Sequence, residues 1–247
     1  MWVRSLLLAT FPLILSAQQS VDFIGRYWIT EMSARIRVEV GGFGTDIDAR
    51  RDLGLPNANF PQGDFTWRKG RIFLTFSYTP IDYSADQNVS RTIVFRGQTY
   101  TIGTRVISDL GVQHLHLAWS YQFLRFHKDV VRLGPLVGAD GFLLHGALAA
   151  PAFNVSEREK LSVGLPVAGL ALNIQPRRWI DIYGQVAGMD VGGYGQFIGS
   201  DAGIKVALWR HLLLTAGYRT FNLHVDHAPD FAQLHIHGPF VGAGFRF

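Results

Sequence analysis

The chain has 247 residues, of which 13% are aromatic, 27 are glycine and 17% are charged, and its formal net charge is +4 at pH 7. Because soluble domains carry roughly 25% charged residues, this composition indicates that much of the surface faces something other than water. The absence of cysteine excludes disulfides, thiolate metal sites and a lipid-bearing cysteine. The basic residues form no single stripe or motif, so the positive charge does not indicate nucleic-acid binding.

The chain begins with a pattern typical of a secretory signal peptide. Arg4 precedes an apolar stretch from Leu6 to Leu15, which leads into the small residues Ser16 and Ala17. The stretch is shorter than the about 20 apolar residues that a transmembrane helix needs, and no later segment is continuously apolar for that length. We therefore predict export with cleavage near Ala17, leaving one mature domain over residues 18–247, a length that suits a single all-β barrel.

Segments of alternating apolar and polar residues, bounded by turn residues, follow along the rest of the chain. We predict strands over residues 27–43, 64–68, 71–83, 102–126, 130–149, 161–174, 179–194, 202–209, 212–225 and 234–247. This pattern is typical of an antiparallel, up-and-down transmembrane β-barrel, here of about ten strands. The segment 64–68 is the weakest of the set, and eight strands is the alternative if it or the connection 192–200 is misread.

The connections between these strands differ in length and charge. The short ones, at residues 68–71, 125–129, 175–178 and 209–211, are all basic. The longer ones carry acidic residues: Asp46, Asp48, Asp52, Asp82, Asp86, Glu157, Glu159, Asp226 and Asp230. Since outer-membrane barrels pair short periplasmic turns with longer extracellular loops, we assign the basic set to the periplasmic side and the acidic set to the outer rim.

The period of two separates the faces of the best-defined strands. In the segment 113–123 the apolar set faces lipid and the alternate set, which includes His114, His116 and Ser120, faces the interior. In the third strand Phe76 and Tyr78 face lipid and Ser77 faces inward. In the opening strand the same logic sends Ala34, Ile36, Val38 and Val40 outward and Glu31, Ser33, Arg35, Arg37 and Glu39 inward. A soluble ligand-binding barrel would show the opposite sense.

The predicted interior is therefore charged. The residues assigned to line it are Glu31, Arg35, Arg37, Glu39, His114, His116, Lys205, Arg219 and Arg246. In a barrel of eight to ten strands, side chains of mixed charge pair across the interior and fill it. The alternative is a narrow, water-filled pore in which the excess of arginine favours anions.

Histidines gather in the last predicted hairpin, where His224, Asp226 and His227 precede the turn and His235 and His237 follow it. A turn near Asp230 places His224 opposite His237 and Asp226 opposite His235 or, in the neighbouring register, His227 opposite His235. Imidazole and carboxylate ligands suit zinc, nickel or copper. These residues are thus a candidate site for a divalent metal at the extracellular mouth, although their spacing matches no named zinc motif.

No constellation of residues indicates catalysis. Pairs such as His224 with Asp226, or His114 with Ser120, can be compared with the sites of outer-membrane proteases and lipid A deacylases, but neither pair has a nucleophile and a base at motif spacing. The chain has no GxSxG motif, no glycine-rich phosphate loop and no carboxylate pair in settings that would separate their pKa values. We predict a protein that is not an enzyme and carries no resident cofactor.

The chain ends on a strand with apolar residues at alternate positions, closed by the aromatic Phe247. Together with the signal peptide and the short basic turns, this strand resembles those of small Gram-negative outer-membrane β-barrel proteins, the broad group that includes the OmpA-type barrels. The resemblance implies recognition by the barrel-assembly machinery, with Val241, Phe245 and Phe247 as the matching positions. The segment 44–48 followed by 52–55 also resembles a segment of uncharacterised barrels of this kind, and implies no residue role.

The sequence thus predicts an integral protein of the bacterial outer membrane with a structural, adhesive or small-solute role. The first alternative is a binding module whose acidic or histidine-bearing rim holds divalent cations or contacts lipopolysaccharide. A further alternative, after this one, is an outer-membrane hydrolase. The expected partners are outer-membrane lipid, lipopolysaccharide and the assembly machinery.

Overall fold

The computed structural model describes residues 19–37, 45–95, 98–127, 129–150, 155–190, 192, 195–227 and 230–247. The predicted signal peptide and Glu39 lie outside these residues. Within them no helix is long and apolar enough to cross a membrane.

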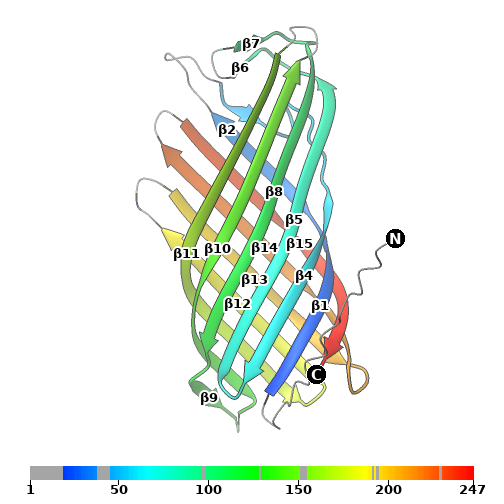
Figure 1. Ribbon diagram of the computed structural model, residues 1–247, viewed down its shortest axis with the longest axis vertical. Helices are drawn as coiled ribbons and strands as arrows, with labels where there is room; N and C mark the ends of the chain where they lie inside the picture. Colours follow the sequence, from blue (N-terminus) through cyan, green and yellow to red (C-terminus); the bar gives the residue numbers. More distant parts are fainter. Residues whose placement is uncertain are drawn as a thin grey trace, which may run out of the picture.

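The fold is a closed, antiparallel barrel of ten strands with a few short additional strands, so the predicted fold class is confirmed and the eight-strand alternative is wrong. The barrel strands are β1 (Gln19–Ile29), β4 (Asn59–Lys69), β5 (Ile72–Asn88), β8 (Arg105–Tyr121), β10 (Val131–Ala150), β11 (Val155–Arg177), β12 (Ile180–Asp190), β13 (Gly195–Ala207), β14 (Leu212–His227) and β15 (Asp230–Arg246). The short strands are β2 (Glu31–Arg37), β3 (Ile47–Asp48), β6 (Ile93–Phe95), β7 (Gln98–Tyr100) and β9 (Leu124–Phe126). Figure 1 shows the steep tilt of the strands around the barrel.

Closure of the barrel depends on the first strand, which pairs with β4 on one side and with β15 on the other. Phe23 lies opposite Phe245 and Trp28 opposite Phe240. Beyond Thr30 the chain continues as β2, which stays paired with β15 but leaves β4 and pairs with β3 instead. The sequence-based start of this strand at residue 27 is eight residues too late, because β1 begins at Gln19.

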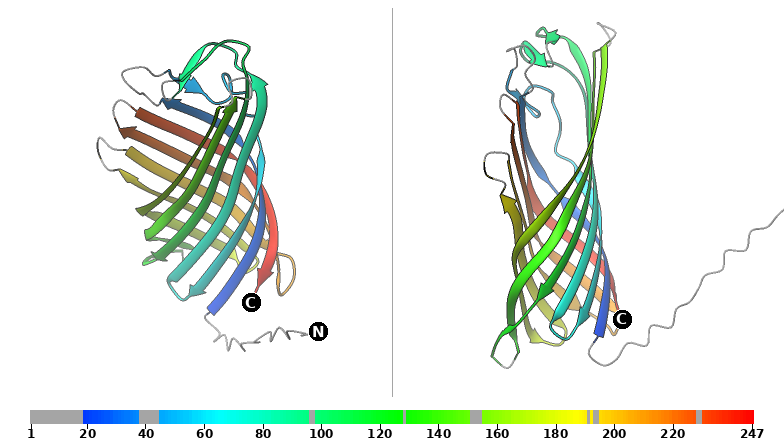
Figure 2. Two further views of the ribbon diagram at one scale, coloured as in Figure 1. Left: turned by 45° about the horizontal axis from the view of Figure 1, so that its top comes forward. Right: turned by 60° about the vertical axis from the view of Figure 1, so that its left-hand side comes forward.

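The two ends of the barrel are built differently. One end, here called the turn end, holds the connections 70–71, 122–130, 178–179 and 208–211 and the end of β15. At Gly70, φ is +59°, a conformation that glycine adopts at little cost and that this tight turn requires. The opposite end, the loop end, holds two long connections, which contain β3, β6 and β7. Its other connections are short because β11, β13, β14 and β15 extend farther toward this end than predicted, whereas β12 ends earlier than predicted. Figure 2 shows these small strands beside the tall strands β5, β8 and β10.

The barrel wall near the turn end has polar side chains inside and apolar side chains outside. On β1, Asp22 and Arg26 are buried, whereas Phe23 and Tyr27 are 48% and 50% exposed. The exposed apolar residues of this lower half include Phe76, Tyr78, Leu117, Trp119, Val137, Leu170, Leu172, Ile204, Leu214, Tyr218, Val241 and Phe245. The facing predicted for β5 and β8 agrees with this arrangement.

Near the loop end the arrangement is reversed, with apolar side chains inside the barrel and polar side chains outside. On β2 the buried residues are Met32 and Ala34, and the exposed ones are Glu31, Ser33 and Arg35. On β5 the same change occurs farther along the strand, where Ile81 and Tyr83 are buried and the alternate residues Asp82, Ser84 and Asp86 are exposed. The upper half of the barrel therefore has an apolar interior and a polar outer face, as a water-soluble protein has.

A contiguous apolar cluster crosses the interior between the two halves. Each barrel strand contributes to it: Trp28, Phe60, Ile81, Val112, Phe142, Val167, Ala187, Phe197, Phe221 and Phe240. At its centre the rings of Phe142, Phe197 and Phe221 lie 5.2–5.5 Å apart between centroids, in tilted and edge-on contacts. We call this cluster the apolar layer.

Candidate functional site

The lower interior is held by ion pairs that join distant strands across the barrel. Arg26 on β1 pairs with Asp64 on β4 and, at 2.6 Å from Nη1 to Oδ2, with Asp201 on β13. The guanidinium carbon also lies 4.5 Å from the ring centroid of Phe240, at the base of the apolar layer. All three charged side chains are nearly buried, so the attraction between them acts in a medium far less polar than water.

A second set of ion pairs lies closer to the turn end. Arg246 on β15 donates two hydrogen bonds to Asp22 on β1, from Nε and Nη2, each 2.7 Å long. Lys205 on β13 lies 3.5 Å from the same carboxylate, and Arg246 lies 3.7 Å from Asp181 on β12. The bidentate geometry fixes the guanidinium plane, so this set ties the first strand to the last in the closing seam.

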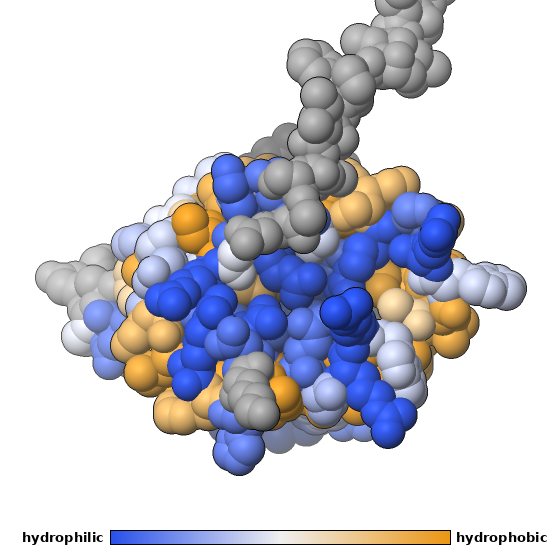
Figure 3. Space-filling view, turned by 90° about the horizontal axis from the view of Figure 1, so that it is seen from below, coloured by the Kyte–Doolittle hydropathy of each residue, from blue (hydrophilic) through white to orange (hydrophobic). Residues whose placement is uncertain are grey.

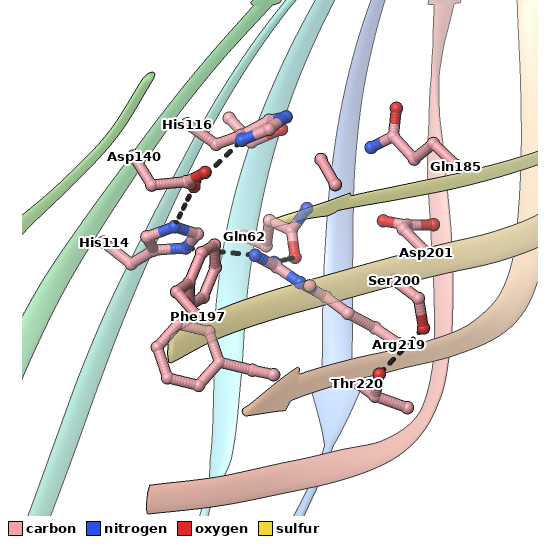
Figure 4. Close-up of a pocket in the computed structure, with 14 residues that line it drawn as sticks. Gln62, His114, His116, Asp140, Gln185, Phe197, Ser200, Asp201, Arg219 and Thr220 are labelled. Carbon is pink, nitrogen blue, oxygen red and sulfur yellow. Dashed lines mark hydrogen bonds and ion pairs between the residues drawn. The ribbon is translucent and has the colours of Figure 1, made fainter. Parts of the chain in front are cut away.

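The third set joins two histidines, an aspartate and an arginine, as Figure 4 shows. Asp140 on β10 accepts hydrogen bonds at Oδ1 from Nε2 of His114 and Nδ1 of His116, at 2.6 and 2.9 Å. Arg219 on β14 donates from Nη2 to Nδ1 of His114 at 3.0 Å. Because arginine only donates, Nδ1 of His114 is the acceptor and its proton lies on Nε2. His114 is thereby held as one tautomer, and its ring stacks on Phe142 at 4.8 Å.

These side chains surround a cavity of about 40 Å³. Nε2 of His116, Oδ2 of Asp140 and Oδ1 of Asp201 are buried and have no hydrogen-bond partner among the described residues. A space of this size holds about one to three water molecules and no larger solute. Both nitrogens of His114 are engaged, and Ser200 and Thr220, which also line the cavity, bond to each other at 2.7 Å. The arrangement is suited to holding strands together and does not present an activated nucleophile.

The structure places five of the predicted interior residues inside the barrel: His114, His116, Lys205, Arg219 and Arg246. The inward assignment of Glu31, Arg35 and Arg37 is wrong. Glu31 and Arg35 are exposed on the outer face, and Arg37 pairs with Asp46 of the loop end. The physical reason is the change of polarity along the strand: on β2 the inner positions are taken by Met32 and Ala34, which belong to the apolar layer, and the charged residues alternate with them on the outer face.

Sequence analysis missed the carboxylates that neutralise the interior. Asp22, Asp64, Asp140, Asp181 and Asp201 all lie inside. The sequence does contain a signal for Asp22, because this polar residue alternates with aromatic residues such as Phe23 that face lipid. The predicted start of the first strand, at residue 27, lies after Asp22 and therefore leaves it out. Asp140 stands between Ala139 and Gly141, and Asp201 between Ser200 and Ala202, so no flanking large apolar residues marked them.

His224, His235 and His237 lie on the outer wall of the upper half. The register places His224 opposite Gln233 and His235 opposite Asn222, so both predicted pairings of histidines are wrong. The cause is that β14 ends at His227 and β15 begins at Asp230, which moves the reversal ahead of Asp230. The side chains of Asp226 and His227 lie outside the described residues. Among those described, no group of three or more histidine, aspartate or glutamate residues is arranged so that it could hold a metal ion.

His224 and His235 instead line a groove on the outer wall, with a volume of about 320 Å³, to which Ile198, Leu223 and Leu234 also contribute. We call it the polar groove after its more numerous polar residues. The other polar residues of the groove are Ser33, Arg35, Gln196, Asn222 and Gln233, from β2, β13, β14 and β15. Just below it Tyr218 and His237 share a hydrogen bond of 2.7 Å at the upper border of the exposed apolar wall. Amides, imidazoles and a guanidinium on one surface are groups that bind hydroxyl and anionic oxygens.

The loop end has a small structure of its own, centred on the segment 45–55. Asp52 is buried and accepts two hydrogen bonds from Arg91, from Nε at 3.0 Å and Nη2 at 2.8 Å, and one from Nε of Arg51 at 3.1 Å. The hydrogen bonds from Arg91 lower the pKa of Asp52 well below its ordinary value. Beside it a separate apolar cluster contains Ile47, Val89, Ile93, Tyr100 and Val106.

The predicted assembly positions, Val241, Phe245 and Phe247, lie on the outer face of the closing seam and are more than half exposed. They are part of the apolar wall of the lower half. Their proposed recognition during assembly stays a prediction.

Structures of known proteins share this fold. The outer membrane protease OmpT from Escherichia coli superposes with a TM-score of 0.55 at 10% identity, over 94% of this chain and 99% of that one. The translocator domain of the autotransporter NalP from Neisseria meningitidis gives 0.46 at 14% identity, over 95% and 90%. The attachment invasion locus protein Ail of Yersinia pestis, in complex with the heparin analogue sucrose octasulfate, gives 0.40 at 11% identity, over 93% and 99%.

The sequence matches no protein-family model and no curated protein. The likeness to OmpT, at 10% identity, establishes the fold of an outer-membrane β-barrel and assigns no activity.

Proposed function

We propose that this chain is an integral outer-membrane protein with a closed barrel, whose function is recognition or adhesion at its water-exposed upper half. The observation that carries the proposal is the apolar layer, to which all ten barrel strands contribute buried side chains. An ion that crossed the barrel would have to lose its hydration within this layer without gaining a polar partner, and such apolar constrictions exclude ions.

Membrane insertion is supported by the lower wall. Its outer face carries large exposed apolar residues on strands all around the barrel, whereas its inner face carries charges. This inverted arrangement is costly in water and favourable in lipid. Where Glu31, Ser33 and Arg35 replace the apolar residues on the outer face, the wall is suited to water and headgroups.

The polar groove around Arg35 is the proposed contact surface. It lies above most of the exposed apolar residues of the wall, at the level where we propose that the sugars and phosphates of outer-leaflet lipid begin. Its guanidinium, amides and imidazoles suit hydroxyl and phosphate oxygens, and we propose lipopolysaccharide as its partner.

The test of closure is single-channel recording on the chain refolded and inserted in a planar bilayer. We expect no discrete conductance steps at neutral pH. Insertion is verified by protease protection in liposomes, and a general porin in the same bilayer is the positive control. Reproducible steps from inserted protein would contradict closure and would favour the small-solute role instead.

A further inference from the structure

The turn end holds an accumulation of positive charge that the ion pairs of the interior do not use. A basin of about 480 Å³ opens there, lined by Arg68, Arg71, Arg125 and Arg132, together with Gln19, Gly70 and Gln175. We call this space, with the four arginines that line it, the arginine basin. Among the described residues that line it there is no carboxylate. Figure 3 shows the hydrophilic surface of this end, ringed by apolar side chains of the wall.

Two of the arginines lie in energetically unfavourable positions. Arg125 on β9 and Arg132 on β10 are direct cross-strand partners, an arrangement in which like charges repel. One acidic group, Asp129, lies beside them and pairs with Arg125 at 3.0 Å while being half exposed. Nε of Arg125 is buried and has no hydrogen-bond partner among the described residues. A buried donor without an acceptor and a like-charged pair are both relieved by an anion.

Two of the four arginines are also held in position by neutral acceptors. Arg132 donates from Nε to the carbonyl of Asp129 at 3.1 Å and from Nη2 to Oε1 of Gln175 at 3.4 Å. Arg68 donates to Oγ of Ser20 at 3.2 Å. Neutral acceptors orient these two guanidinium groups without cancelling their charge, so the four arginines keep a net positive charge even though Asp129 pairs with Arg125.

We propose that the arginine basin is a binding site for a phosphate-bearing anion. Guanidinium groups bind phosphate oxygens through paired N–H donors, and several groups converging on one space favour an anion of charge −2 or more. The phosphate belongs either to a soluble polyanion or to a lipid headgroup of the adjacent leaflet. In the orientation proposed above, the basin faces the periplasm; the site itself depends only on the residues that line it.

The experiment measures pyrophosphate binding to the full refolded chain in a neutral detergent, by titration calorimetry at low salt. The double variant Arg125→Gln/Arg132→Gln should bind at least tenfold more weakly than the wild type. The control is Arg177→Gln/Arg178→Gln, which removes the same charge from the same end but outside the basin, and should change affinity less than twofold. The single variant Arg71→Gln, at an exposed residue of the basin, should weaken binding about threefold. It keeps the proposal testable if the double variant fails to fold.

Equal losses in the basin and control variants would show only diffuse attraction and would overturn the proposal, as would absence of pyrophosphate binding by the wild type. The source of the phosphate follows from a second arm in nanodiscs. If phosphatidylglycerol in place of phosphatidylcholine competes with pyrophosphate in the wild type, and not in Arg71→Gln, the lipid phosphate occupies the basin. If the lipid makes no difference, the ligand is soluble.

Discussion

The lower and upper halves of this barrel use the same strands with opposite chemistry. Below the apolar layer, Arg26 and Asp22 face inward and Phe23 and Tyr27 face outward. Above it, Met32 faces inward and the charged residues face outward. The strands run through both halves without a break in alternation, so the difference lies in the solvent that each half meets. A β-strand specifies two faces, and its environment decides which one is inside.

The two halves also place ion pairs differently. In the lower half the pairs are inside, where Arg26 and its two aspartates are nearly inaccessible to solvent. In the upper half they lie in the loop-end structure, where Arg91 is partly exposed and only Asp52 is buried. Removing one partner of a buried pair leaves an uncompensated charge, which costs more than losing a surface pair. The lower half should therefore respond more strongly to charge substitutions.

The largest effect is expected for Arg26→Met. The substitution leaves Asp64 and Asp201 facing each other without their shared cation, at a cost of about 3–5 kcal/mol of unfolding free energy. Urea unfolding of the barrel in liposomes measures it.

The matched control for Arg26 adds Asp64→Asn and Asp201→Asn to the same chain. Neutralising the whole network should recover most of the loss, because no unpaired charge then remains. A loss of unfolding free energy below about 1 kcal/mol for Arg26→Met alone would mean that the lower interior is hydrated. Its ion pairs would then be screened by water as those of the upper half are.

A smaller, local effect is expected for Asp52 in the upper half. Since the folded protein lowers its pKa, ionised Asp52 contributes stability above its unfolded value of about 3.9, and this contribution is lost as the pH falls below that value toward the folded pKa. Hydrogen exchange of the segments 45–55 and 89–95, taken relative to the intrinsic exchange rate at each pH, should therefore stay slow at pH 5 and accelerate at lower pH, with the barrel strands unaffected. Asp52→Asn should accelerate it already at pH 7.

The matched pair for this comparison is Arg105 with Asp86, at the same end of the barrel. These side chains are 62% and 49% exposed, and the hydrogen bonds from Arg105 also lower the pKa of Asp86. Because solvent screens an exposed pair, Arg105→Gln should leave the exchange of segment 45–55 unchanged. An equal response to both substitutions would show that the loop-end structure depends on net charge and not on the buried Asp52.

The extent to which sequence predicted this structure follows from the same contrast. Alternation gave the barrel, its ten strands and the facing of β8, because Leu117 and Trp119 belong to the lower half, where the outer-membrane pattern applies. It placed Arg35 on the wrong side of the wall, because the alternation of side chains has the same period of two in both halves. The cation of the central ion pairs, Arg26, was missed because it lies before the predicted start of its strand, and cross-barrel partners such as Asp201 are 175 residues away.

The smallest expected effect is also the most direct test of the reversal. If Arg35 faced the interior, Arg35→Ser would disturb the packing there and alter any ion selectivity. On the outer wall above the apolar band, it should change the unfolding free energy by no more than about 0.5 kcal/mol and leave conductance as in the wild type. What it should lower is the rise in melting temperature caused by added lipopolysaccharide, because Arg35 lines the polar groove. Glu31→Gln, on the same outer face but outside the groove lining, is the control and should leave that rise unchanged. A loss of stability with an unchanged lipopolysaccharide response would place the Arg35 side chain inside and contradict both the reversal and the proposed contact surface.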